Sequence, residues 1–439
     1  MTVGKASSAP NRPATIWVLW VLLAGCSSNK SAARTVPIDA PLETAPPAAL
    51  ASDAGPSDAT AADAAGPDAA PRDGADFEPE ARIIYRVAAC GGEDAVPERI
   101  DPKMVEAHCK DLMAKYEEYR TQWMNVAMPY IAALVPKGLP PEVVYPFGGG
   151  DLMTALATFP DAPVYTTISL EIAGDVRKID TITMKKLADE LALNRLHLGK
   201  LFEKVHSRTV NLDLESKSDL PGEVVFSMVG LALYGYEPVS LRYFKFKPDG
   251  TIHYLEQAEI DAAEKDAVAK KKKPSEVEAD LFGDMELGFR RVSDPKAPIK
   301  ILRHVAYNLD DKHMRADPSL LKHLEAKGKI TAMTKAASHF LWSDDFSVIR
   351  QYLLDHMEWM ISDSTGIPPK FANKAGFVQD TYGIMEWPAA FGPVDNKNAE
   401  DLRKLFKSNP EKDLPFRYGY PDRDHHGHMM ITRKPNIAR

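Results

Sequence analysis

A cluster of potential metal ligands lies close to the end of the chain. Asp422, Asp424, His425, His426 and His428 place three imidazoles and two carboxylates within seven residues, and these are groups that first-row metals bind. If His426 and His428 open a strand, they project from one face and could share Zn²⁺ or Cu²⁺. We therefore take Asp424, His425, His426 and His428 as candidate ligands, with a solvated histidine-rich turn as the alternative. No second motif such as H-E-x-x-H supplies a catalytic base.

A glycine turn offers a second kind of site. Gly148, Gly149 and Gly150 follow an apolar stretch and precede Asp151, and Glu171 comes 23 residues after the first glycine. Glycines between a strand and a helix leave backbone N–H groups free for an anion, and an acid after the next strand can hold a ribose. The three glycines and Glu171 are thus candidate cofactor-binding residues, and Asp151 and Glu171 are candidate catalytic acids. The turn departs from G-x-G-x-x-G, however, and Asp151 puts a carboxylate near the anion position, so a tight structural turn is the alternative.

A third candidate is Ser364, within the segment from Asp363 to Pro368. It could act as a nucleophile with His339 or His356 as its base. The G-x-S-x-G signature is absent, and the same residues fit a turn that ends a helix. We favour the structural interpretation.

The N-terminus predicts export and lipidation. Lys5 and Arg12 precede an apolar run over residues 16–23, which is too short to span a bilayer and closes on the tetrapeptide LAGC at Cys26. This tetrapeptide resembles the lipobox of bacterial lipoproteins, which implies diacylation of Cys26 and removal of residues 1–25. Ser27 after the cysteine implies sorting to the outer membrane. An ordinary secretory signal is the alternative.

Residues 26–80 predict a lipid anchor followed by a disordered tether. Beyond Cys26 the composition is Ala, Pro, Asp and Ser, with ten acids against three bases, and it cannot bury enough apolar surface to offset the entropy of ordering. The whole chain has a formal charge of −8, most of which lies in this segment. The remainder shows no basic excess of the kind that nucleic-acid binding needs. The expected partners are the membrane, through the lipid, and an envelope macromolecule or small ligand.

Cys90 and Cys109 are the two cysteines left after lipidation of Cys26. An exported protein is in a compartment that allows disulfides, so we predict a bridge between Cys90 and Cys109, with two buried thiols as the alternative.

Residues 81–439 predict a single α/β domain, because helical and strand patterns alternate along them. The expected fold is a Rossmann-like three-layer sandwich with an added N-terminal helix and a β-hairpin, and with a charged surface insertion at about residues 259–282. The predicted strands cover residues 239–246, 285–292, 299–307 and 428–432. The predicted helices begin at Asp101-Pro102 and cover residues 183–206, 224–233, 319–327, 331–341 and 346–361.

Two family resemblances bear on the glycine turn. The unit from Val143 to Ile172 resembles the first βαβ unit of Rossmann-like domains, methyltransferases in particular, which implies a nucleotide-type cofactor. The chain also resembles an uncharacterised bacterial family, often lipoproteins, over residues 83–435. The matching blocks are YPFGG at Tyr145–Gly149 with Asp151, then Phe159-Pro160 and Leu170-Glu171, and later Asp363–Pro368 with Phe371 and Tyr382-Gly383. That resemblance implies one shared domain and no assigned activity.

These observations predict an outer-membrane lipoprotein whose α/β domain acts by binding in the cell envelope. One alternative is a Rossmann-like hydrolase or transferase with its site at Asp151 and Glu171, and another is a periplasmic metal-binding protein. S-adenosylmethionine and NAD are not generally available outside the inner membrane, which disfavours a working cofactor site. A deep cleft containing Asp151 and Glu171 would favour the enzyme, and a filled one would favour binding.

Overall fold

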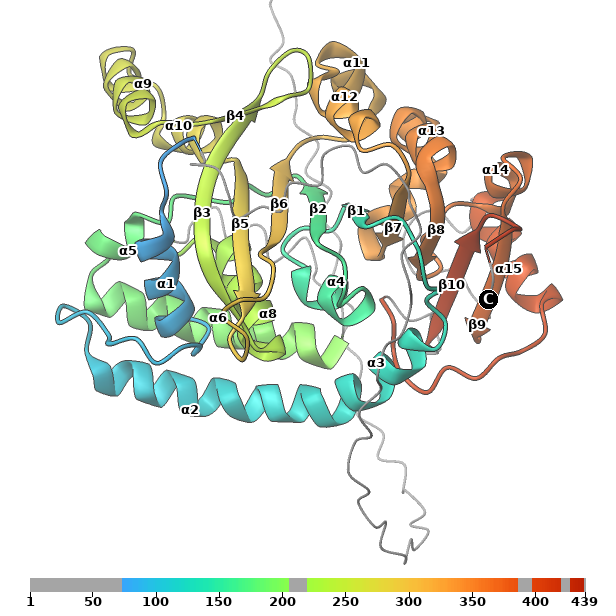
Figure 1. Cartoon of the computed structure of the whole chain (residues 1–439), viewed down its shortest axis with the longest axis horizontal. Helices are drawn as coiled ribbons and strands as arrows, with labels where there is room; N and C mark the ends of the chain where they lie inside the picture. Colours follow the sequence, from blue (N-terminus) through green and yellow to red (C-terminus); the bar gives the residue numbers. More distant parts are fainter. Residues whose placement is uncertain (1–72, 205–218, 386–396, 420–426, 438–439) are drawn as a thin grey trace, which may run out of the picture. The chain divides into compact units, whose positions relative to one another are not determined.

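The computed structural model describes residues 73–204, 219–385, 397–419 and 427–437 (Figure 1). Residues 64–439 group into one compact unit built on a ten-stranded mixed sheet, in the order β4-β3-β5-β6-β2-β1-β7-β8-β10-β9. Helices cover both faces of this sheet, so the expected three-layer α/β class is confirmed. The predicted signal peptide, Cys26 and most of the tether lie outside the described residues. No helix in the described ranges is long and apolar enough to cross a membrane.

Five parallel strands form the centre of the sheet. Taken in chain order, they stand third, second, first, fourth and fifth across the sheet, which is the order of the doubly wound Rossmann fold. Their connections diverge on either side of the first strand, so a topological switch point lies between β1 and β7. The strands are β6 (Lys300–Ala306), β2 (Val164–Ser169), β1 (Glu142–Pro146), β7 (Ile330–Thr334) and β8 (Met357–Ser362).

Antiparallel strands extend both ends of this centre. The predicted hairpin is confirmed, because β5 pairs with β6 and opposes Met285 to His304. At the other end β10 runs antiparallel between β8 and β9, and β9 had no counterpart among the predicted strands. The added strands are β3 (Tyr236–Phe246), β4 (Ile252–Tyr254), β5 (Asp284–Arg291), β9 (Val378–Gly383) and β10 (His428–Arg433).

Two separate cores lie on the two faces of the sheet. Val143 and Tyr145 belong to one core and Val144 to the other, as the period of two along a strand requires. The first core is covered by α1 (Glu78–Val87), α2 (Pro102–Tyr119), α3 (Asn125–Ala132), α4 (Leu152–Thr158), α5 (Lys178–Thr181), α6 (Met184–Lys204) and α8 (Gly222–Tyr234). The second is covered by α11 (Asp311–Ala316), α12 (Ser319–Ala326), α13 (Ser347–His356) and α14 (Pro369–Lys374), and α15 (Lys397–Ser408) forms a small third cluster.

Two predicted helices were wrong where they met the sheet. Residues 331–341 contain β7 followed by a 3₁₀ helix over Ala336–Trp342, and residues 346–361 contain α13 followed by β8. Both strands are almost entirely buried. A parallel strand buried on both faces reads as a continuous apolar run, which sequence periodicity does not separate from a buried helix.

The added N-terminal helix is confirmed as α2. The Asp101 carboxylate caps it by accepting from the N–H of Lys103 at 3.0 Å, and Pro102 occupies the first turn. A π-helical segment over Arg120–Met124 links it to α3, which contains Pro129 and ends at Ala132. Cys90 and Cys109 form the predicted disulfide, with their Cα atoms 5.4 Å apart.

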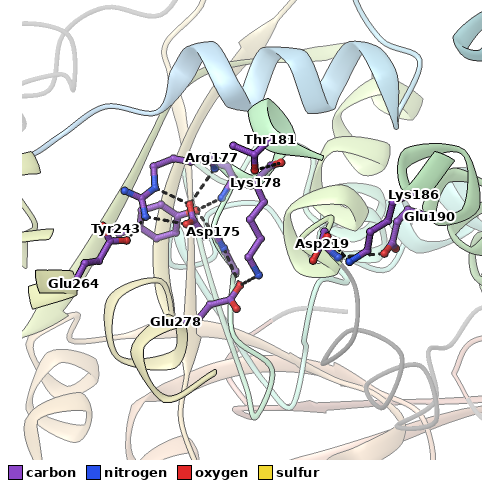
Figure 2. Close-up of polar contacts among 12 residues, drawn as sticks. Asp175, Arg177, Lys178, Thr181, Lys186, Glu190, Asp219, Tyr243, Glu264 and Glu278 are labelled. Carbon is purple, nitrogen blue, oxygen red and sulfur yellow. Dashed lines mark hydrogen bonds and ion pairs between the residues drawn. The ribbon is translucent and has the colours of Figure 1, made fainter. Parts of the chain in front are cut away.

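The charged insertion forms two helices, α9 (Gln257–Ala269) and α10 (Pro274–Leu281). Figure 2 shows how ion pairs attach it to the segment that follows β2. The Arg177 guanidinium contacts Glu264 of α9 at 2.6 Å, and Lys178 contacts Glu278 of α10 at 2.6 Å. Phe282, directly after α10, lies under the Arg177 guanidinium at 4.7 Å. The insertion is therefore anchored at its inner side, while its Lys270–Lys273 run stays exposed.

Asp284, the first residue of β5, gives a pH-dependent prediction. Burial raises the pKa of Asp284 from 3.8 to about 7, although its carboxylate accepts the N–H of Ala306 at 2.8 Å. Between these two values the folded state keeps a proton that the unfolded state has lost, so stability should fall as pH rises through that window and stay low above it. Asp284→Asn should remove this slope and be more stable than the wild type by about 1–2 kcal/mol near pH 8, after discounting for partial solvent access.

Urea denaturation of both proteins near pH 5 and near pH 8 measures this effect. Wild-type and variant stabilities that differ equally at both pH values would contradict it.

Candidate functional site at the carboxyl ends of the parallel strands

The switch point is flanked by two strained backbone positions. Phe147 after β1 has φ of 61° and Ala336 after β7 has φ of 57°, a region that side chains other than glycine rarely adopt. Such conformations persist only where surrounding structure enforces them, and they concentrate at functional sites. The strands' carboxyl ends are also where ligands bind in open α/β sheets, so this edge is the candidate site.

Asp151 is held by four donors rather than left facing a ligand. It is the N-cap of α4 and accepts from the N–H and the hydroxyl of Thr154 at 3.1 and 2.7 Å. Its other oxygen accepts from the Tyr145 hydroxyl at 3.0 Å and pairs with Lys335 Nζ at 2.7 Å. Asp151 is 8% exposed and Lys335 2%. A carboxylate held in this way acts as a cap and counter-ion, and it is poorly placed to be a free catalytic base.

A second buried acid faces the glycine turn. Glu223, in the first turn of α8, lies so close to Gly150 that a Cβ atom there would be 2.7 Å from its Oε2. The same carboxylate would lie 3.6 Å from a Cβ atom at Gly149. The space beside Gly149 and Gly150 is therefore occupied by a carboxyl group of the chain itself. Nothing in the sequence pattern marked Glu223, because it acts across more than 70 residues of chain.

Glu171 lies at the end of β2, where the sequence predicted it, but its main-chain carbonyl makes the defined contact. His304 on β6 donates Nε2–H to that carbonyl at 2.8 Å, and its Nδ1 lies 3.3 Å from the Thr167 hydroxyl. Burial lowers the pKa of His304, and its Nδ1 is 3.8 Å from Glu223. Asp151 and Glu171, both described, share no hydrogen bond or ion pair. A joint catalytic role for Asp151 and Glu171 stays a prediction.

Asp363 ties the ends of β7 and β8 together. Its fully buried carboxylate accepts from the N–H of Ala336 at 3.0 Å and from the N–H of Thr365 at 2.8 Å, and it also accepts from the Thr365 hydroxyl. A Cβ atom at Gly419 would lie 2.2 Å from this carboxylate, so only glycine fits there. These bonds hold the strained conformation at Ala336.

Ser364 meets a histidine that differs from both predicted bases. Its Oγ lies 2.6 Å from Nε2 of His428, the first residue of β10, and both side chains are fully buried. His339 instead lies against the main-chain oxygen of Ala336, and His356 against that of Gly328. His339 and His356 were only candidate bases for Ser364, and the histidine beside it is His428, which β10 brings next to β8 from 64 residues along the chain.

The predicted metal cluster is described only in part. His428 is directed at Ser364, while Asp424, His425 and His426 lie outside the described residues. Within the described ranges, no group of three or more His, Cys, Asp or Glu side chains is placed to hold a metal ion. Metal binding at this cluster stays a prediction.

An aromatic cluster accompanies the site. It consists of Phe147, His339, Phe340 and Phe346, with ring centroids 4.5–5.9 Å apart between its neighbours. Phe340 is 38% exposed, and burial lowers the pKa of His339, which favours the neutral, stackable ring. The cluster joins the end of β1 to the segment after β7, beside the strained residues. It gives this edge a partly exposed apolar surface.

Comparison with protein-family models, curated proteins and solved structures returned no match.

Proposed function

We propose that this chain is a lipoprotein of the outer membrane whose Rossmann-like domain acts by binding an envelope component. Lipidation at Cys26 and the acidic tether supply the anchoring part of the proposal. One observation carries the binding part. The positions that would take a cofactor at the switch point are occupied by the chain's own charges, Asp151 with Lys335 and Glu223 against Gly150.

Electrostatics makes this occupation hard to reconcile with a nucleotide site. A phosphate brought to the glycine turn would meet the buried Glu223 carboxylate, and like charges in a poorly solvated site repel strongly. Lys335 would be the cation to offset a phosphate here, and it is already paired with Asp151 at 2.7 Å. The aromatic cluster, by contrast, leaves Phe340 partly exposed, and aromatic side chains are enriched at protein interfaces. The carboxyl edge of the parallel strands is therefore better suited to contact with a protein or other envelope partner than to binding a nucleotide cofactor.

Two measurements on the untagged protein purified from membranes test the proposal. The mass of the N-terminal peptide should show an acylated Cys26, and Cys26→Ala should leave the membrane fraction. Native mass spectrometry with elemental analysis should show no retained nucleotide and no S-adenosylmethionine. An unmodified N-terminus would overturn the anchoring part, and a stoichiometric nucleotide lost on Gly150→Ala would overturn the binding part.

A hydrolase or transferase is the second candidate, and the Ser364–His428 contact of 2.6 Å favours it. A histidine Nε2 at this distance can take the proton of a serine nucleophile. Because both side chains are buried, a segment above them would have to move for a substrate to enter. Covalent labelling of Ser364 by a fluorophosphonate, absent in Ser364→Ala and His428→Gln, would establish the enzyme. An unlabelled wild type would leave the pair as a structural hydrogen bond.

A further inference from the structure

A cavity lies on the second face of the sheet, away from the site above. It opens between α13 and α14 and reaches the residue that follows β10, in the region of α13, α14 and β10 in Figure 1. Its volume is about 450 Å³, within the usual range for small-ligand sites. Its lining includes Arg350, Gln351, Asp355, Phe371, Lys374 and Lys434.

The charge of this cavity is positive. Three of its lining residues are cations, while Asp355 is the one acid among them. The Asp355 carboxylate accepts from the side-chain amide of Gln351 at 2.8 Å. Lys374 is exposed and makes no hydrogen bond or ion pair with any described residue. The lining side chains therefore carry a net positive charge, with three cations against one acid.

The buried Arg350 side chain is held in one position, and not all of its N–H groups are used by the described residues. It is 5% exposed, and its Nη1 donates to the main-chain oxygens of Leu341 and Ser343 at 2.8 and 2.6 Å. Its guanidinium carbon lies 3.9 Å from the centroid of the Phe371 ring. Its acidic contact, Asp344 at 3.5 Å, has a side chain that is 96% exposed. The Nε–H donates to no described residue, so a rigid guanidinium edge remains for a ligand.

Lys434 completes the arrangement from the opposite side. Its ammonium lies 3.8 Å from the centroid of the Phe377 ring and 3.4 Å from the main-chain oxygen of Ala375. This last contact is long for a charged donor, so the amine is available to an anion in the cavity. A fixed guanidinium with two flanking ammonium groups is the donor set that recognises phosphate.

We propose that the cavity between α13 and α14 binds a phosphate group, through Arg350, Lys374 and Lys434. The phosphate comes either from a soluble phosphorylated molecule or from a phospholipid headgroup, since both present the same oxygens to the three cations. The site is independent of the proposed function at the carboxyl edge, because it shares no residue with it.

Calorimetric titration of the full mature protein in a neutral detergent tests this proposal, with inorganic phosphate and dihexanoyl phosphatidic acid as probes. The wild type should bind phosphate saturably, and Lys374→Gln/Lys434→Gln should weaken binding by at least about tenfold. Lys272→Gln/Lys312→Gln is the matched control, since it removes the same charge from exposed positions outside the cavity. The control should bind phosphate with the affinity of the wild type. Rising salt should weaken phosphate binding by the wild type and by the control.

The two probes separate the sources of the phosphate. Tighter binding of phosphatidic acid than of inorganic phosphate assigns the cavity to a lipid headgroup, and equal affinity assigns it to a soluble molecule. Absence of saturable phosphate binding by the wild type, or equal losses in the cavity variant and the control, would overturn the proposal. Lys374 is exposed and Lys434 half-buried, and glutamine keeps the first part of each side-chain stem, so the variants should fold; circular dichroism verifies that they do.

Discussion

Lys335→Met should destabilise the domain by about 3–5 kcal/mol, because it leaves the Asp151 carboxylate buried without its counter-ion. The pair is 2.7 Å apart, and Lys335 also donates to the Thr154 hydroxyl at 2.8 Å. Methionine keeps the length of the lysine stem, so the loss comes from the charge rather than from a cavity. Urea denaturation at neutral pH measures the change in the free energy of unfolding.

A double variant shows whether the stranded charge is the cause. Asp151→Asn/Lys335→Met should recover a large part of the loss, since an amide still accepts from Thr154 without carrying charge. Lys312→Met, at an exposed position, is the control and should change stability by less than about 0.5 kcal/mol. If Lys335→Met behaves like this control, the pair does not hold the switch point together.

Cys90→Ser/Cys109→Ser should destabilise the protein by about 3 kcal/mol, the value that the chain-entropy model gives for a loop of this size. The bridge spans 19 residues and joins the segment after α1 to α2. On one side of it, α1 packs on the first core through Ile84 and Val87. Loss of the bridge opens this loop in the unfolded chain. The unfolded state then gains conformational entropy, which destabilises the folded protein.

Denaturation of the wild type with and without reductant, beside the double-serine variant, measures this effect. Reductant should lower the wild type to the variant's stability and leave the variant unchanged. Equal stabilities of oxidised and reduced wild type would show that the bridge between the segment after α1 and α2 adds nothing to stability. Intact-mass measurement supplies the control, because the oxidised protein should be two hydrogens lighter than the reduced one.

The amino-acid sequence by itself determined the features that depend on near neighbours. Asp101 followed by Pro102 was enough to place the start of α2, and a turn between two apolar stretches was enough to predict the β5–β6 hairpin. The glycines after β1 predicted a strand-to-helix turn, and α4 begins at Leu152. Two cysteines in an exported chain predicted the disulfide. Each of these inferences rests on local backbone preferences or on the chemistry of two residues.

The tertiary structure decided everything that depends on strand order. β7 and β8 were predicted as helical because a buried parallel strand lacks the alternation that would reveal it. Their placement beside β1 and β10 then sets the partners of the site, bringing Lys335 to Asp151 and His428 to Ser364. These pairs are separated by 184 and 64 residues of chain. Their contact follows from which strands pair in the sheet, and no local pattern encodes that choice.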